Sequence, residues 1–551
     1  MDHLALEGRG GVKPSTPMPA TLATAPSDSC CARSRNTARL GASVVIAILA
    51  SVFVAMGMAG WPGLHWDANL FATPVINVAT GKGWIFGGYP IALVARDSIN
   101  YASHGVLHVW VFGSLLGCET WEKFLHWCGI VNAATFVAWT CLFCRTLRLG
   151  GHAGIFRPVG CGLLAGVIAV GLQGRPEHLA PLLISLPLLL RDLGLPTRLF
   201  QIATYALAGL LFTTSPASGL LFGMGLVFWL SLKFERDNNR RFWQELIVAG
   251  SAAAITTVLV VTLCCPFSFF QWLTGILSGS ATAMDFSGHL FRFQWRALTG
   301  ISMEAPLWNL CVLSTAVWAS FILLRRGKFV GLTIFVSLML YCQPRLTDYG
   351  YVAFFPCILL FLISRHPSSR MACARPAGKV RLLRLATVLA CLYTLVFVRT
   401  AGLTLLHIRH GPSMAATRAQ LVSLGAMTWL DHPVATTFNN LSRPSFIVFG
   451  DASERYVAAM PQRHMDWVDT ALVAYSEKFH RPVEFFIYPQ VEAGQAPEEV
   501  RVGNERCTRV YNGWTMDRPR LLGFDLGGAM PGYQFALYRS STSGEHDSPA
   551  P

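Results

Sequence analysis

Long apolar runs are the feature that most constrains the fold of this chain. Between about residues 40 and 403, mainly apolar stretches follow one another with only short polar breaks. A helix needs about 20 such residues to cross the hydrocarbon core of a bilayer. Over the whole chain, 53% of the residues are hydrophobic and only 13% are charged, a composition that is foreign to soluble domains. The pattern therefore predicts a polytopic α-helical membrane protein.

The basic residues follow the membrane pattern as well. The formal net charge is +14, and Arg and Lys gather in clusters between alternate apolar runs, as the positive-inside rule requires of cytoplasmic loops. A nucleic-acid binder would carry basic stripes interleaved with aromatic residues outside the membrane, and the sequence shows no such stripe. This threading predicts about 11 transmembrane helices, over residues 40–60, 122–144, 154–172, 178–195, 199–213, 216–232, 246–266, 304–324, 328–343, 349–364 and 383–403.

The composition divides the chain into three parts. Residues 1–39 are polar and rich in Ser, Thr and Pro, which predicts a disordered cytoplasmic N-terminal tail. Residues 40–403 form the predicted transmembrane domain, with a large outer loop over 61–120. Within that loop, the apolar run at 104–117 is too short to span and predicts a helix lying at the membrane interface.

The third part, residues 404–551, has a different composition and residue pattern. Apolar and polar residues alternate there and turn residues are frequent, which predicts a small C-terminal α/β domain on the extracytoplasmic side. The predicted elements are helices over 412–430 and 453–479 and strands in PSFIVFGD, VEFFIYP and GYQFALYRS.

Polar residues gather at the predicted outer ends of the spans. Charged groups near the membrane level are costly unless they are paired or face a cavity, so their gathering on one side predicts a single outward-facing polar site. Its candidate residues are Asp67, Asp97 and His104 in the first outer loop, Arg175 and Glu177 in LQGRPEHL, and Arg345 and Tyr349 in QPRLTDYGY.

The order of these parts resembles a known family, and four stretches carry the resemblance: WDANLFATPVINVATGKGW, DSINYASHGVLHVWVFGSLLG, GRPEHLAPLL and PRLTDYGYVAFFP. The family is the GT-C type of polyprenyl-phosphate-sugar-dependent membrane glycosyltransferases, which includes protein O-mannosyltransferases and lipid A aminoarabinose transferases. The layout is similar over about residues 40–365. Many members carry two adjacent acids in the first outer loop, whereas Asp67 is followed here by Ala68.

The resemblance implies an inverting sugar transfer on the outer face of a cell membrane, expected to be a bacterial inner membrane. It implies that Asp67 takes the proton of the acceptor nucleophile and that Arg345 and Arg175 bind the donor phosphate through their forked guanidinium groups. The remaining substrate-binding candidates are His104, Glu177, Tyr349 and Asp97. The expected partners are a polyprenyl-phosphate sugar donor, membrane lipids and an envelope glycan, lipid or protein acceptor.

No cofactor is required by this chemistry, and no metal site is predicted. His104 and His108 are one helical turn apart, which is compatible with a metal, but no third ligand lies near them in the sequence. A divalent metal stays an unsupported option.

Several candidates have a structural alternative. Asp67 is well placed to cap the helix that begins near Asn69, and Asp97 to cap or turn its loop. Arg175 and Glu177 have the alternative of pairing with outer-face charges to hold the loop.

Two further candidates also have alternatives. Asp348 is an alternative partner for Arg345, and His104 has the alternative of an interfacial histidine. At the level of the whole protein, the alternatives are a multi-spanning transporter or lipid flippase and a noncatalytic GT-C-like scaffold. Transporters commonly show internal repeats, and none is visible in this sequence.

Overall fold

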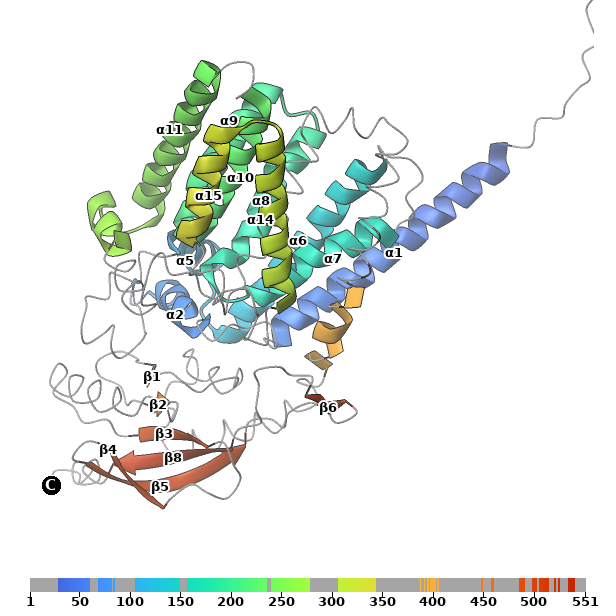
Figure 1. Cartoon of the computed structure of the whole chain (residues 1–551). Coiled ribbons are helices and arrows are strands. Elements are labelled where there is room, and N and C mark those ends of the chain that lie inside the picture. The colour runs from blue at the N-terminus through green and yellow to red at the C-terminus, as the bar shows by residue number, and fades with distance from the viewer. Residues whose placement is uncertain are drawn as a thin grey trace, which may run out of the picture. The chain divides into compact units, whose positions relative to one another are not determined.

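The structure is a computed structural model that describes part of the chain (Figure 1). Two compact units are separated, Met1–Ala47 and Ile48–Pro551, and in the first of them the described residues belong to one helix. The described residues are 28–59, 68–84 without Lys82, 105–148, 156–234, 239–277 and 306–342, single helical positions between 387 and 405, and strand positions between 447 and 540.

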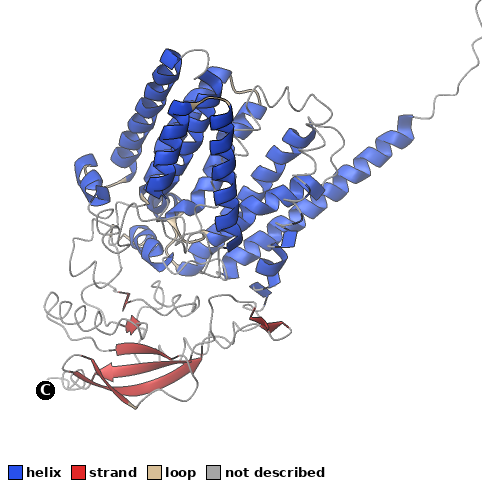
Figure 2. Ribbon diagram, in the orientation of Figure 1, coloured by secondary structure: helices blue, strands red, loops and turns tan. Residues whose placement is uncertain are grey.

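Helices account for most of the described chain, as the blue ribbons in Figure 2 show. They coincide with each predicted span from 40–60 to 328–343. The bounds are α1 (Asp28–Ala59), α2 (Ala68–Ala79), α5 (Val106–Val109), the π-helix η1 (Trp110–Leu115), α6 (Trp121–Arg148), α7 (Phe156–Gly171), the 3₁₀ turn η2 (Pro176–Leu179), α8 (Ala180–Asp192), α9 (Thr197–Thr214), α10 (Pro216–Phe234), α11 (Asn239–Cys264), α14 (Pro306–Arg325) and α15 (Phe329–Cys342).

Within the described chain, four helices are long and apolar enough to cross a membrane. They are Leu40–Ala59, Glu122–Arg145, Pro216–Phe234 and Arg240–Cys264. Along α11, Ile255 and Leu263 are 60% and 78% exposed, an apolar surface that suits contact with lipid. The helical membrane character is thus supported, whereas the count of 11 spans stays a prediction. The span predicted at 349–364 lies outside the described residues, and 383–403 is described in part.

Within the predicted segment 104–117, a helix is present as α5 followed by η1, and its location at the membrane interface stays a prediction. By length, Val106–Leu115 belongs to the shorter apolar helices and is not one of the four that are long enough to cross a membrane. The described part begins at Gly105, whose φ of +88° is a left-handed conformation that favours glycine.

Helices in the second unit approach one another closely at glycines. A Cβ atom built on Gly57 of α1 would lie 2.1 Å from the Cα atom of Gly129 in α6. A Cβ atom on Gly209 of α9 would lie 2.0 Å from the carbonyl oxygen of Ala253 in α11. Small residues allow helix backbones to meet in this way, which is how apolar helices pack when lipid competes for their surfaces.

The C-terminal part contains a six-stranded sheet with the order β1-β2-β3-β8-β5-β4. The β2–β3 pair is parallel and the other pairs of this sheet are antiparallel. Strands β6 and β7 form a separate pair. The bounds are β1 (Ile447–Val448), β2 (Val457–Ala459), β3 (Phe485–Gln490), β4 (Glu499–Val502), β5 (Glu505–Trp514), β6 (Arg520–Leu521), β7 (Phe524–Asp525) and β8 (Gln534–Ser540).

The three predicted strands are confirmed by β1, β3 and β8. The helix predicted over 453–479 is wrong at Val457–Ala459, which pairs with Phe485–Ile487 as strand β2. Pairing with a neighbouring strand supplies the backbone hydrogen bonds that local helical spacing would otherwise satisfy, so tertiary context overrides the local pattern. The helix predicted over 412–430 lies outside the described residues.

Strands β4 and β5 were not predicted from the sequence. Val502 pairs with Glu505, and the two residues between them are Gly503 and Asn504. A two-residue Gly-Asn connection between alternating strands is a hairpin signal.

Candidate functional site

Two of the predicted site residues, Arg175 and Glu177, lie in the described part of the chain. Both are buried where α7 is followed by α8. Asp67, Asp97, His104, Arg345 and Tyr349 lie outside the described residues. Arg175 and Glu177 are therefore the predicted site residues whose contacts the structure describes.

The turn that carries this pair follows from its sequence. Gly174 adopts a φ of +82°, which lets the chain reverse after α7 ends. Arg175 is extended, with φ −96° and ψ 157°, as the residue before a proline prefers. Pro176 then opens the 3₁₀ turn η2, where its missing N–H group costs nothing.

Arg175 and Glu177 form a buried ion pair. Nε of Arg175 donates to Oε2 of Glu177 over 3.0 Å, and the two side chains are 5% and 4% exposed. Charges removed from water are tolerated when they are paired and hydrogen-bonded in this way. The sequence left open that each of them pairs with other outer-face charges; in the structure they pair with each other.

Two segments of the predicted outer loop 61–120 contact this turn. The guanidinium carbon of Arg175 lies 5.4 Å from the ring centroid of Phe71, which follows Asp67 by four residues in the sequence. A Cβ atom built on Gly105, the residue after His104, would lie 2.8 Å from Cγ of Pro176. The start of α2 and the start of α5 thus both meet the turn.

A chain of hydrogen bonds links this turn to two long helices. Nε2 of Gln173 donates to the carbonyl oxygen of Gly57 in α1 over 2.6 Å. Nδ2 of Asn132 in α6 donates to Oε1 of Gln173 over 3.1 Å. Oδ1 of Asn132 then lies 2.7 Å from Nε2 of His178.

The direction of these hydrogen bonds shows which nitrogen of His178 carries the proton. The carbonyl of Gly57 can only accept, so Gln173 uses its NH₂ group there and its oxygen accepts from Asn132, whose own oxygen then accepts from His178. Nε2 of His178 must then carry the proton, which leaves Nδ1 with a lone pair in the neutral ring. Nδ1 is buried and has no hydrogen-bond partner among the described residues.

His108 adds two further buried nitrogens nearby. Its ring lies 4.8 Å from Phe112 and 5.9 Å from Phe124 between centroids, and the ring of Phe112 also stacks on His178 at 6.3 Å. Neither nitrogen of His108 has a partner in the described part of the structure. Burial, together with the repulsion that protonated His108 and protonated His178 would exert on each other, lowers the pKa of His108 from 6.5 to about 3, so its ring is neutral at pH 7.

These residues form one polar centre, defined as Arg175, Glu177, His178, Gln173, Asn132 and His108. Buried polar atoms without partners cost about 1–3 kcal/mol each and call for an explanation such as a bound group or a catalytic role. The neutral imidazoles supply acceptors and a donor for hydroxyl groups, while the Arg175–Glu177 pair supplies charge. Unpartnered nitrogens of this kind are suited to hydrogen bonds with hydroxyl groups.

The helix next to the polar centre has an unusual backbone. Residues Trp110–Leu115 are π-helical, and the backbone N–H of Leu116 donates to the carbonyl of Val111 over 2.9 Å. A Cβ atom on Gly113 would lie 2.8 Å from the carbonyl oxygen of Val75 in α2. Single π-helical turns are frequent at functional sites, and this one packs directly on the helix that follows Asp67.

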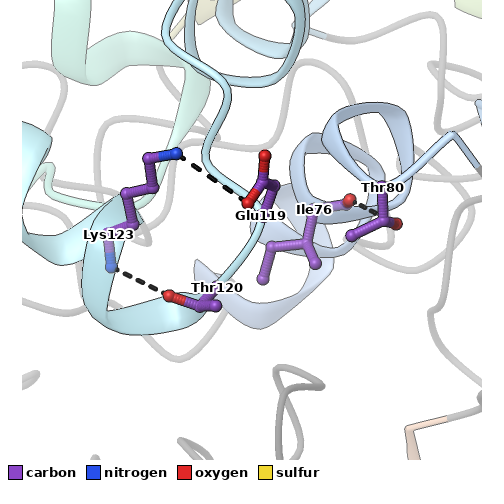
Figure 3. A network of polar contacts seen from close by, with 5 residues as sticks. All are labelled: Ile76, Thr80, Glu119, Thr120 and Lys123. Carbon is purple, nitrogen blue, oxygen red and sulfur yellow. Dashed lines mark hydrogen bonds and ion pairs between the residues drawn. The ribbon is translucent and has the colours of Figure 1, made fainter.

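Short polar contacts fix the neighbouring helix ends (Figure 3). Oγ1 of Thr80 donates to the carbonyl of Ile76 at the end of α2 over 2.8 Å. At the start of α6, the backbone N–H of Lys123 donates to Oγ1 of Thr120 over 3.3 Å. Thr120 therefore caps α6, and the Lys123–Glu119 ion pair at 3.9 Å adds to this exposed end.

Sequence reasoning missed part of the centre. Asn132 was not singled out, although an amide inside an apolar span is the kind of residue that marks an internal polar contact. His178 was given no role in the sequence analysis, and His108 was considered only for a metal. Among the described residues, no group of three or more His, Cys, Asp or Glu side chains is arranged to hold a metal ion.

No protein-family model, no curated protein and no solved structure matches this chain. The function is therefore inferred from the sequence pattern together with the geometry of the polar centre.

Proposed function

We propose that this protein is a membrane glycosyltransferase that moves a sugar from a polyprenyl-phosphate-linked donor to an acceptor on the extracytoplasmic face. The acceptor is an envelope glycan, lipid or protein. Asp67 is the base, Arg345 and Arg175 hold the donor phosphate, and substrate contacts come from His104, Glu177, Tyr349 and Asp97. The polyprenyl tail stays in the bilayer while its phosphate reaches the polar residues at the outer edge.

The observation that carries the proposal is the contact of Arg175 with Phe71. Arg175 comes from the turn between α7 and α8, whereas Phe71 lies in the first turns of the helix that follows Asp67. The contact between these two segments supports a single site that is shared by an acid and an arginine from distant parts of the sequence. Sugar transfer from a lipid phosphate needs both, a carboxylate as the base and a cation to stabilise the leaving phosphate.

The reaction proceeds by displacement at the anomeric carbon. The carboxylate of Asp67 takes the proton from the acceptor nucleophile, which forms a bond to the anomeric carbon as the bond to the phosphate oxygen breaks. The electron pair leaves with the polyprenyl phosphate, whose growing negative charge is stabilised by guanidinium groups. Attack from the opposite side inverts the configuration.

Arg345 takes the main part in binding the phosphate. Glu177 already neutralises much of the charge of Arg175, so Arg175 serves mainly to position the turn and adds part of its charge to the phosphate. This division assigns different consequences to the loss of each arginine. Loss of Arg345 weakens donor binding, whereas loss of Arg175 also destabilises the fold.

The test is sugar transfer in membranes supplied with a panel of radiolabelled polyprenyl-phosphate sugars. The natural protein is compared at equal abundance with Asp67→Asn and with Asp237→Asn, a matched loss of an acid in a loop predicted to be cytoplasmic. Transfer should fall by at least about 100-fold in Asp67→Asn, since general bases contribute that much or more. It should persist in Asp237→Asn.

Other outcomes separate the alternatives. Transfer that survives Asp67→Asn would keep the enzyme class and remove the base assignment. Absence of transfer from every donor, with Asp67→Asn still complementing a deletion strain, would favour a transporter or a noncatalytic scaffold.

A further inference from the structure

Two buried histidines of the polar centre carry nitrogens that neither the fold nor the proposed reaction uses. His108 lies in α5 and His178 in the turn η2, and both residues are 0% exposed. Nε2 of His178 is hydrogen-bonded to Asn132. Nδ1 of His178 and both nitrogens of His108 have no partner within the part of the chain that the structure describes. Buried polar atoms in this state call for an explanation such as a ligand.

The two histidine rings belong to one place in the fold. The start of α5 packs on η2, where a Cβ atom built on Gly105 would lie 2.8 Å from Cγ of Pro176. The ring centroid of Phe112 lies 4.8 Å from that of His108 and 6.3 Å from that of His178. The histidines are also close enough to interact electrostatically when both are protonated. One ligand can therefore meet both segments.

A role in packing does not account for the two histidines. The ring of His108 lies against Phe112 and Phe124, and an apolar side chain would pack there without burying a polar atom. Taking a polar group out of water without a hydrogen bond opposes folding. The bond to Asn132 accounts for one nitrogen of His178. A ligand that bonds to the other three nitrogens would account for the rest.

The protonation of the rings favours a hydroxyl group as that ligand. Nδ1 of His178 carries a lone pair, so its ligand must donate a hydrogen bond, which an ionised phosphate or carboxylate oxygen cannot do. The ring of His108 is neutral at pH 7 and offers one donor and one acceptor. A hydroxyl group both donates and accepts, so it suits each of these nitrogens. Aromatic surroundings with a few polar groups are typical of small-molecule sites.

Both histidine-bearing segments meet the helix that follows Asp67. The contact of Arg175 with Phe71 joins the turn before α8 to α2. Gly113, in the π-helix that continues α5, packs on Val75 of the same helix α2. In the proposed reaction the sugar lies between the base and the phosphate, so its hydroxyl groups are the ligands that this placement supports.

We propose that His108 and His178 bind hydroxyl groups of the transferred sugar and thereby determine which donor sugar is used. This inference rests on the proposed glycosyltransferase function and adds two specificity-determining residues to it. Nδ1 of His178 accepts a hydrogen bond from one sugar hydroxyl, and His108 bonds to another. A donor that lacks one of these hydroxyls leaves a buried nitrogen without its partner, which is the situation in which hydrogen bonds discriminate most strongly between substrates.

The test measures kcat/KM for the best donor of the radiolabelled panel and for analogues of that donor that each lack one sugar hydroxyl. The full-length natural protein is compared with His108→Phe and with His178→Gln. Gln at this position still offers an NH₂ group to Asn132 but has no counterpart of the acceptor Nδ1. The matched control is His126→Phe, which replaces an exposed histidine of α6.

In the natural protein, removal of a bound hydroxyl should lower kcat/KM by about tenfold or more. In His108→Phe, kcat/KM for the intact donor should fall, and removal of the hydroxyl that His108 binds should then cost no more than about threefold. In His178→Gln, the penalty should disappear for a different hydroxyl. His126→Phe should keep every penalty of the natural protein. If His178→Gln does not give folded protein, the result with His108→Phe decides.

Three results would overturn the proposal, and they separate it from the proposed function. If the natural protein uses every deoxygenated donor within about threefold of the intact one, no hydroxyl is recognised and sugar transfer still stands. If the penalties persist unchanged in the histidine variants, other residues recognise the hydroxyls. Absence of transfer from every intact donor would instead remove the glycosyltransferase function, and this inference with it.

Discussion

His178 donates its Nε2 proton to the side-chain oxygen of Asn132 over 2.7 Å, and this bond leaves Nδ1 as a buried acceptor. The bond joins the turn after α7 to the middle of α6. It is the last link of the chain that runs through Gln173 to the carbonyl of Gly57. Stability of the polar centre should therefore depend on Asn132.

Replacement of Asn132 by Leu should lower the free energy of unfolding by about 2 kcal/mol or more, because Gln173 and His178 would each lose a buried partner. The thermal unfolding midpoint in detergent measures this. Thr135→Ala is the control, since its hydroxyl donates to the carbonyl of Val131 in the same helix over 2.7 Å and its loss orphans no other side chain of the centre. Equal effects of the two changes would contradict the assigned network.

Glu177→Gln should destabilise the protein by about 3–5 kcal/mol, because it leaves the buried charge of Arg175 without its carboxylate. The double variant Arg175→Met with Glu177→Gln should recover a large part of that loss, since the charge is gone as well. Thermal unfolding of the two single variants and the double variant gives the coupling between the residues. Additive effects would show that the ion pair contributes little.

His108→Phe should raise the unfolding midpoint, because the new ring fits an aromatic cluster and removes two buried nitrogens without partners. His126→Phe is the control, since His126 is exposed on α6 and its replacement should change stability little. A functional role of the His108 nitrogens predicts that sugar transfer falls in the same stabilised variant. Unchanged transfer would leave His108 a core residue only.

The pH dependence of stability follows from the same histidine. The pKa of His108 is about 6.5 in the unfolded chain and about 3 in the folded protein. Between these two pH values, the ring is therefore protonated in the unfolded state and neutral in the folded state. Because of this difference, the free energy of unfolding is unaffected by His108 protonation above pH 6.5 and decreases as the pH falls from 6.5 towards 3. Unfolding midpoints at pH 7 and pH 4.5 should therefore differ more in the natural protein than in His108→Phe, and parallel decreases would contradict the shift.

Gly105→Ala tests the contact between the start of α5 and the turn at Pro176. Gly105 and Gly81 both have positive φ values, of +88° and +78°, so Ala at either position is strained by about 1–2 kcal/mol. A Cβ atom at Gly81 meets nothing within 4 Å, whereas one at Gly105 meets the ring of Pro176 at 2.8 Å. Gly105→Ala should lower the unfolding midpoint more than Gly81→Ala, and similar decreases would mean that the contact is dispensable.

Local patterns predicted much of the helical part. Helices lie at each predicted span up to 328–343 because hydropathy is a property of consecutive residues and needs no knowledge of partners. The strand prediction was weaker. Val457–Ala459 reads as helix locally and pairs as a strand, since sheet pairing depends on a distant segment.

The candidate site was predictable as a gathering of polar residues but not as a set of contacts. The sequence predicts that Arg175 and Glu177 lie on the outer side and leaves open that they pair with other charges there, whereas the structure pairs them with each other. Asn132 gave one weak signal, an amide in an apolar run. Its bond to Gln173 joins residues 41 positions apart, and that of Gln173 to Gly57 joins residues 116 positions apart, distances over which sequence spacing carries no information.

The sequence by itself determined a helical membrane character and the positions of most helices, because apolar runs act through consecutive residues and need no distant partner. Tertiary structure decided that Phe71 covers Arg175, that Gly105 meets Pro176 and that His178 is oriented by Asn132. These contacts join segments that are far apart in the sequence, as α1 and α6 are where they approach each other at Gly57 and Gly129, and such contacts are fixed by the packing of both partners together.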